Sequence, residues 1–350
     1  MQLAFILAGS VDAVSGPAAY IRHVILGLRE TGHDVTVVEL PGSYPVTDET
    51  ARSAARGALT SLAADRLAII DGLAVPAFAG QGDSLAARPT IALIHHPTAL
   101  GTGISDSERA SLRNTELRLL PRFARVIATS EATAERLVAE FGMDRARIRV
   151  VVPGIDAAPR SPGAAGTGCA ILSIGALIPR KGHDVLIRAL GRLFDLDWKL
   201  TIVGAAARDP NYAASLDTLV RELRLEGKVQ FAGELDDAAL EDLWSMADIF
   251  ALASYWEGYP TGVAQALKRG VPVAITSEGP AAGLVPAEAG IICKPGDVEQ
   301  FSKALRRMIF DKGLRKSMAD AAWTAGQTLP SWDRQIPVFI EALSWQQPST

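Results

Sequence analysis

This chain of 350 residues has few long apolar runs, only two cysteines and no excess of positive charge. Its formal net charge of −4 excludes the usual nucleic-acid binder, because phosphate binding requires a concentrated basic face. The opening stretch MQLAFILAGS has no basic segment before its apolar run, and that run is too short for a signal peptide or a membrane span. We therefore expect a cytoplasmic protein with no nucleic-acid partner.

The segment from Arg109 to Arg125 contains five arginines, and at their spacing part of one helix face is expected to be basic. Acidic neighbours dilute this charge, so a solvated helix face is favoured over a contact with lipid headgroups. At most we expect a peripheral contact with a membrane.

The only two cysteines are Cys169 and Cys293. They lie far apart, each inside an apolar run that is typical of a strand, CAILSIG and AGIICKPG. Both are expected to be reduced residues of a protein core.

The chain does contain enough apolar material for more than one core. Hydrophobic residues make up 48% of it and charged residues 21%, which is ordinary for a globular protein. A chain of this length exceeds the usual size of one domain, so we expect two domains of about 150 residues each.

Short apolar runs alternate with helical segments along the chain, a pattern that predicts parallel sheets covered by helices. A stretch rich in proline and glycine, PGIDAAPRSPGAAGTG, interrupts the alternation. The pattern predicts two Rossmann-like doubly wound α/β domains that face a central cleft. The expected segments are a first domain at 1–154, a linker at 155–168, a second domain at 169–330, and a helix at 331–350 that returns to the first domain.

Two common phosphate-binding motifs are missing. Gly-x-Gly-x-x-Gly follows neither of the two domain-opening strands, and GALIPRKG is no P-loop because its lysine precedes the glycine. The segment PRKGHDVLIRAL instead places Arg180 and Lys181 just before a helix, where two cations and free N–H groups can hold a diphosphate. The alternative is a pair of solvated charges before a helix.

The combination of these segments is more specific than any one of them. The chain carries HHPTALGTG and VIATSEATAERL in its first half, and SIGALIPRKGHDVLIRAL, WEGYPTGVAQAL and RGVPVA in its second. In order and spacing it resembles the retaining nucleotide-sugar glycosyltransferases of family 4, which have the GT-B fold. The resemblance spans nearly the whole chain.

The resemblance implies roles for specific residues. Glu257 would contact the hydroxyls of the donor sugar and face the positive charge that develops on its ring. Lys181 would neutralise the departing diphosphate, with Arg180 beside it. Backbone N–H groups of the turn after the glutamate would share the sugar contacts, and these belong to Gly258, Tyr259 and Thr261.

In this family a histidine after a strand of the first domain lies beside the donor sugar. His95 and His96 both match that position, and we favour His95. The two cannot readily hold one metal ion, because neighbouring side chains on a strand point to opposite faces. The reaction implied by the resemblance needs no metal and no cofactor; the nucleotide sugar is a substrate.

The sequence departs from the family pattern around the expected donor site. Ala176 stands where an arginine is usual, Pro260 where a glycine is usual, and Gly16 is followed by Pro17 instead of a second glycine. Gln265 replaces a glutamate that grips the ribose of the nucleotide. Gly16, Pro260 and Gln265 nevertheless occupy donor-site positions, and proline is tolerated at the first position of a helix.

Two functions of different classes follow. The first is a retaining glycosyltransferase that moves a sugar from a nucleotide diphosphate donor, UDP- or GDP-linked, to a small-molecule or lipid-linked acceptor. The second is a catalytically weakened relative that binds a partner. Retention of Glu257, Lys181 and the histidine pair favours the enzyme. Specificity depends on loop geometry, so the residues predict neither the sugar, the acceptor nor the oligomeric state.

Overall fold

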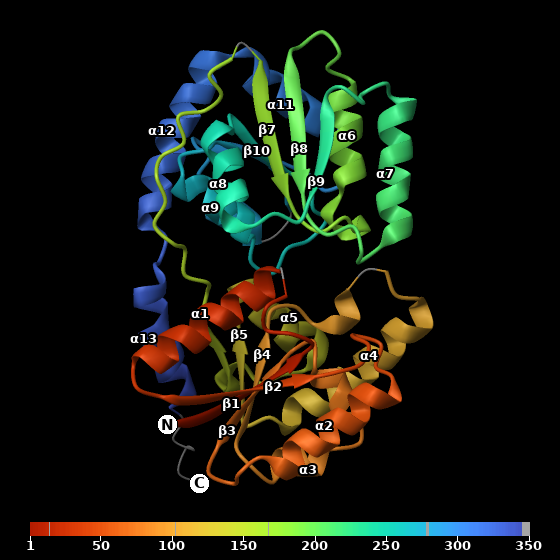
Figure 1. Cartoon of the computed structure of the whole chain (residues 1–350), viewed down its shortest axis with the longest axis vertical. Coiled ribbons are helices and arrows are strands. Elements are labelled where there is room, and N and C mark those ends of the chain that lie inside the picture. The colour runs from red at the N-terminus through yellow and green to blue at the C-terminus, as the bar shows by residue number, and fades with distance from the viewer. Residues whose placement is uncertain (14, 102, 167, 278–279, 345–350) are drawn as a thin grey trace. The chain divides into compact units, whose positions relative to one another are not determined.

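The structure is a computed structural model that describes residues 1–13, 15–101, 103–166, 168–277 and 280–344. The chain divides into two compact units, Met1–Gly154 with Pro330–Thr350, and Ile155–Leu329. Each unit contains a parallel sheet flanked by helices (Figure 1).

The sheet of the first unit has the strand order β2-β1-β3-β4-β5-β6. Its strands are β1 (Gln2–Ala8), β2 (Asp34–Leu40), β3 (Leu67–Asp71), β4 (Thr90–Ile94), β5 (Arg125–Ala128) and β6 (Ile148–Val150). The order reverses between β1 and β3, which makes the carboxyl ends of these strands the topological switch point of the unit. The helices of the unit are α1 (Gly16–Glu30), α2 (Glu49–Ser61), α3 (Gly82–Ala86), α4 (Asp106–Leu119), α5 (Glu131–Phe141) and α13 (Trp332–Leu343).

The C-terminal helix α13 packs on α1 in the first unit. Gly27 makes this close approach possible, since a Cβ there would lie 2.5 Å from Ile336. Phe339 stacks at 6.4 Å on Phe5 of strand β1, and the Arg125 guanidinium donates to the Ala342 carbonyl at 2.9 Å. The last helix is therefore part of the core of the first unit.

The sheet of the second unit has the strand order β12-β11-β10-β7-β8-β9. Its strands are β7 (Cys169–Ile174), β8 (Trp198–Val203), β9 (Val229–Gly233), β10 (Ile249–Leu252), β11 (Val273–Thr276) and β12 (Gly290–Cys293). The order reverses between β7 and β10, so this unit also has a switch point where two loops diverge. Its helices are α6 (His183–Gly191), α7 (Pro210–Glu222), α8 (Asp237–Met246), α9 (Thr261–Lys268), α10 (Pro280–Leu284), α11 (Val298–Phe310) and α12 (Lys312–Thr328).

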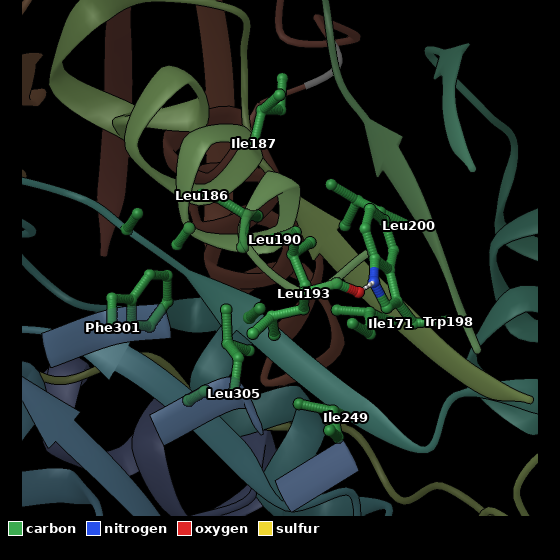
Figure 2. Packing of buried hydrophobic residues seen from close by; sticks show 14 of the residues in the cluster. Ile171, Leu186, Ile187, Leu190, Leu193, Trp198, Leu200, Ile249, Phe301 and Leu305 are labelled. Atoms are coloured by element: carbon green, nitrogen blue, oxygen red, sulfur yellow. Dashed lines mark hydrogen bonds between the residues drawn. The ribbon is translucent and has the colours of Figure 1, made fainter. Parts of the chain in front are cut away.

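Both faces of the second sheet are buried, which is why its strands read as continuous apolar runs. Figure 2 shows one of the two faces, where Leu186 and Leu190 of α6 approach Phe301 and Leu305 of α11. Trp198, the first residue of β8, is buried in the same core and donates its indole N–H to the Leu193 carbonyl at 2.9 Å. This packing fixes the direction in which β7 enters the loop that carries Lys181.

The two cysteines lie in these strands as the sequence predicts. Cys169 opens β7 and Cys293 ends β12, and both are buried free thiols. Burial raises the pKa of the Cys169 thiol to about 12 and that of Cys293 to about 11. They are core residues without thiolate chemistry.

Candidate functional site

The two loops that leave the switch point of the second unit carry most of the predicted donor-binding residues. The loop after β7 leads through a short 3-10 turn, Pro179–Lys181, into α6, and the loop after β10 leads into α9. Ligands of open α/β sheets bind outside the carboxyl ends of the strands at such a point. The fold therefore brings the two segments together although 76 residues separate Lys181 from Glu257.

Gly182 ties the first loop to the second. Its φ is +61°, and a Cβ built on it would lie 2.1 Å from the carbonyl oxygen of Ala253. Only glycine adopts this conformation without strain and also allows so close an approach of two backbones. A further link is the Tyr255 N–H, which donates to the Arg180 carbonyl at 2.9 Å.

Glu257 is the centre of a buried ion-pair network. Lys181 Nζ donates to Glu257 Oε1 at 2.5 Å, and Arg180 Nη1 lies 3.3 Å from Glu257 Oε2. The Glu257 side chain is 10% exposed, against 16% for Lys181 and 21% for Arg180. Arg180 also donates to the Trp256 carbonyl at 2.5 Å. The residues expected to hold the sugar and the diphosphate thus contact one another directly.

The electrostatics of this network keep the acid ionised. Burial on its own would raise the pKa of Glu257, but the charges of Lys181 and Arg180 lower the pKa to about 2. Burial lowers the pKa of the Lys181 ammonium, and the Glu257 charge opposes that effect. An ionised carboxylate faced by two cations can accept hydroxyl hydrogen bonds and stabilise positive charge nearby.

Ser254 belongs to this network and was missed by the sequence analysis. Its hydroxyl donates to Glu257 Oε1 at 2.6 Å, and its carbonyl accepts from Thr276 Oγ1 at 2.8 Å. The second bond links the ends of the neighbouring strands β10 and β11. Serine at the end of a strand is too common to be singled out, although its place three residues before Glu257 is a usable signal.

His183 is a second residue that the sequence did not single out. It is fully buried at the start of α6, with Nε2 at 3.2 Å from both the Gly175 and Ala176 carbonyl oxygens. Because carbonyls only accept, the imidazole proton lies on Nε2. Burial lowers the pKa of His183 to about 4, so the ring is neutral at pH 7. Its role is to hold the turn that precedes Lys181.

The turn after Glu257 begins α9. Pro260 occupies the N-cap of this helix, whereas the sequence suggested that it would occupy the first helical position. The Thr261 N–H donates to the Tyr259 carbonyl at 3.0 Å, and the next N–H groups of α9 have no partner within the helix. Gly258 is buried, and burial raises the pKa of the Tyr259 hydroxyl to about 12.

Gln265 lies on the second turn of α9 and is half-buried. Within the part of the chain that the structure describes, its side-chain amide has no hydrogen-bond partner. The amide is therefore available to a ligand, while its backbone carbonyl accepts from Arg269 at 3.2 Å inside the helix.

The first unit holds the remaining predicted residues, His95 and Gly16. His95 follows β4, and its ring lies edge-on to Tyr20 of α1 at 5.1 Å between centroids. Its Nε2 is buried without a hydrogen-bond partner among the described residues. Burial lowers the pKa of His95 to about 4, so this ring is also neutral at pH 7. Gly16 is exposed at the first position of α1, after the N-cap Ser15.

Four of the five arginines between 109 and 125 contact polar groups within the first unit. Arg109 donates to the carbonyls of Ala99 and Gly101, and Arg113 donates to the Glu140 carbonyl. Among the helices of the described residues, none combines the length and the hydropathy that a membrane span requires. Across the same residues, no group of three or more His, Cys, Asp or Glu side chains is arranged to hold a metal ion.

Two doubly wound parallel units in one chain are the architecture of the GT-B fold. The family follows from the sequence models that match. Residues 14–158 match the model of Glycosyltransferase Family 4, and residues 155–324 match that of Glycosyl transferases group 1. The chain belongs to glycosyltransferase family 4.

A curated relative agrees with this family. The mannosylfructose-phosphate synthase of Agrobacterium fabrum is 29% identical over 64% of this chain and 56% of its own length. The chain spans about half the length of the curated relatives it matches.

Two solved structures cover both units. Sucrose-phosphate synthase from Thermosynechococcus elongatus has a TM-score of 0.81 at 19% identity, over 97% of this chain and 98% of that one. The Anabaena protein HepE in complex with UDP-glucose has a TM-score of 0.77 at 18% identity, over 98% and 99%. These likenesses show the fold.

Proposed function

We propose that this protein is a retaining glycosyltransferase that moves a sugar from a UDP- or GDP-linked donor to a small-molecule or lipid-linked acceptor. The observation that carries the proposal is the contact of Lys181 and Arg180 with Glu257 at the switch point of the second unit. A protein of the same fold, HepE from Anabaena, has been solved in complex with UDP-glucose, and this supports a nucleotide-sugar donor. The helix α9 begins beside the acid and supplies unpaired N–H groups.

The residues have separate tasks in this reaction. Lys181 and Arg180 neutralise the diphosphate as the bond between the anomeric carbon and the phosphate oxygen breaks. Glu257 accepts hydrogen bonds from sugar hydroxyls, and its charge stabilises the positive charge that develops on the ring. Its ionisation across the physiological pH range, assured by a pKa of about 2, is what this task requires.

Retention follows when the acceptor hydroxyl attacks from the face that the diphosphate leaves. The new bond joins the acceptor oxygen to the anomeric carbon, and the hydroxyl proton passes to the departing phosphate oxygen. The products are the glycosylated acceptor and the nucleoside diphosphate. His95, neutral at pH 7, is a hydrogen-bonding residue for the donor sugar in this scheme and carries no charge.

A panel of UDP, GDP, ADP and their sugars in a thermal-shift assay tests the proposal. A ligand at 100 times its dissociation constant stabilises the native state by about 2.7 kcal/mol, enough for a clear rise in Tm. We expect at least one nucleoside diphosphate and its sugar to raise Tm at millimolar concentration. The absence of any shift would contradict the donor site, and binding without turnover would favour the weakened relative.

A further inference from the structure

A third cation lies beside the ion-pair network of the second unit. Arg208 belongs to the loop between β8 and α7, and β8 pairs directly with β7. Residues of this loop lie on the turn that follows β7: the Leu177 N–H donates to the Ala205 carbonyl at 2.9 Å. A Cβ built on Gly204 would lie 2.1 Å from the Gly175 oxygen, so the two backbones are in direct contact.

The loop is also fixed at its far end. Asp209 accepts from the Tyr212 N–H at 3.0 Å and so caps α7, and the Tyr212 hydroxyl donates to Asp184 Oδ1 at 2.6 Å. Asp184 lies in the first turn of α6, three residues after Lys181. The backbone at Arg208 therefore lies between two points of contact with the segment that carries Lys181, one at Ala205 and one at Tyr212.

The side chain of Arg208 differs from its two neighbouring cations in one respect. Lys181 and Arg180 are both paired with Glu257. Arg208 is exposed, and its guanidinium makes no hydrogen bond or ion pair with any residue that the structure describes. Arg180, Lys181 and Arg208 together carry three positive charges against the one negative charge of Glu257, and this excess matches a dianion such as a diphosphate.

The electrostatic coupling of these groups supports their proximity. Burial is the largest influence that lowers the pKa of Lys181, and the charges of Arg180 and Arg208 lower it further. A like charge affects a pKa in this way only at short range. The Arg208 charge therefore acts on the ammonium group of Lys181.

We infer that Arg208 is a donor-binding residue that contacts the diphosphate together with Lys181. This inference rests on the proposed function. Glu257 competes with a bound phosphate for Lys181 and Arg180, whereas none of the described residues competes for Arg208. A guanidinium also offers two parallel N–H donors to a phosphate, which an ammonium group cannot do.

The test compares Arg208→Ala with a matched control, Arg221→Ala. Arg221 is an exposed arginine at the other end of α7, and its loss changes the net charge by the same amount. The affinity of each variant is measured by calorimetry for UDP, GDP or ADP, whichever the wild type binds, and for the matching nucleoside. Circular dichroism and Tm establish that both variants are folded.

We expect Arg208→Ala to weaken diphosphate binding by about tenfold and to leave nucleoside binding within about twofold. Arg221→Ala is expected to bind both ligands like the wild type. Arg208→Lys is expected to bind the diphosphate with intermediate affinity, because it keeps the charge and loses the paired donors. The weaker binding of Arg208→Ala should also show a smaller dependence on salt.

Two results would overturn the inference and are distinguishable. Unchanged diphosphate binding by Arg208→Ala, or an equal loss for Arg221→Ala, would overturn the role of Arg208 and leave the proposed function intact. A wild type that binds none of the three nucleoside diphosphates would overturn the proposed function and this inference together.

Discussion

Lys181 and Glu257 form a 2.5 Å hydrogen-bonded ion pair across the switch point of the second sheet. The pair joins a cation assigned to the diphosphate with a carboxylate assigned to the sugar. It orients each side chain through the other, since both are largely buried and each is the other's nearest opposite charge. In the proposed function, this single contact therefore links phosphate binding to sugar binding.

Replacement of the acid separates catalysis from folding. We expect Glu257→Gln to lower turnover by about a hundredfold or more, because a neutral amide cannot stabilise positive charge in the transition state. The amide oxygen still accepts from Lys181 and Ser254, so Tm should fall by only about a few degrees. Steady-state kinetics and thermal unfolding measure the two effects.

The matched control for this variant is Glu299→Gln, which removes an exposed carboxylate paired with Lys303 at 2.7 Å in the same unit. It should change neither turnover nor, measurably, Tm. Unchanged turnover in Glu257→Gln would favour a residue elsewhere as the group that faces the developing charge.

His183 makes the stability of the second unit depend on pH. The pKa of this buried ring is about 4, below its ordinary value of 6.5. The unfolded chain takes up a proton between these pH values and the folded chain does not, so stability is full above pH 6.5 and is lost as pH falls towards 4. This difference in pKa corresponds to a loss of about 3 kcal/mol at most in the free energy of unfolding.

The variant His183→Gln tests this dependence, because its amide can donate to the Gly175 carbonyl but does not titrate. Urea unfolding at pH 7, 5.5 and 4 should show a smaller loss of stability in the variant than in the wild type. Parallel losses in the two proteins would mean that other groups cause the pH dependence.

Gly182 is expected to tolerate no side chain. In Gly182→Ala the new methyl group would meet the Ala253 carbonyl, at a backbone angle that alanine rarely adopts. We expect a loss of about 2 to 4 kcal/mol in unfolding free energy, together with weaker nucleotide binding as the Lys181 turn shifts. Chemical unfolding and calorimetry measure these changes.

The control is Gly313→Ala in α12, where the nearest atom to a new Cβ lies 3.4 Å away and the backbone angle is not left-handed. Its stability should be unchanged or slightly raised, since alanine favours helix more than glycine does. A Gly182→Ala protein as stable as this control would show that the two loops are not held together at Gly182.

Gln265 provides a gain-of-affinity test. Its amide has no partner among the described residues, and a carboxylate there would bind a ribose hydroxyl more strongly by about 1 kcal/mol. We expect Gln265→Glu to tighten nucleotide binding by about fivefold and to leave turnover at saturating donor unchanged. Weaker binding would mean that the pocket is adapted to the amide, and the ribose contact of the family would not apply here.

The alternation of short apolar runs with helical segments was enough to predict the parallel sheets, because strands buried on both faces are short and continuously apolar. The helix α2 gave no comparable signal. Its buried face consists of small residues, Ala51, Ala55 and Ala58, with Leu59. Alanine occurs on helix surfaces as readily as in cores, so the sequence shows no apolar stripe that would predict this helix.

The candidate site was predictable only in part. The resemblance to the family singled out Lys181 and Glu257, but their ion pair depends on strand order, which residue spacing does not reveal. Arg208 and His183 escaped notice for a similar reason. Each acts through a neighbour in space, and a lone arginine in a loop or a histidine at a helix start has many ordinary explanations.

The most direct test of this account is a crystal structure of the protein with a bound nucleoside diphosphate from the thermal-shift panel. The account predicts that phosphate oxygens lie within hydrogen-bond distance of Lys181 Nζ, at the switch point between β7 and β10. Well-defined phosphates that contact neither Lys181 nor Arg180 would contradict it.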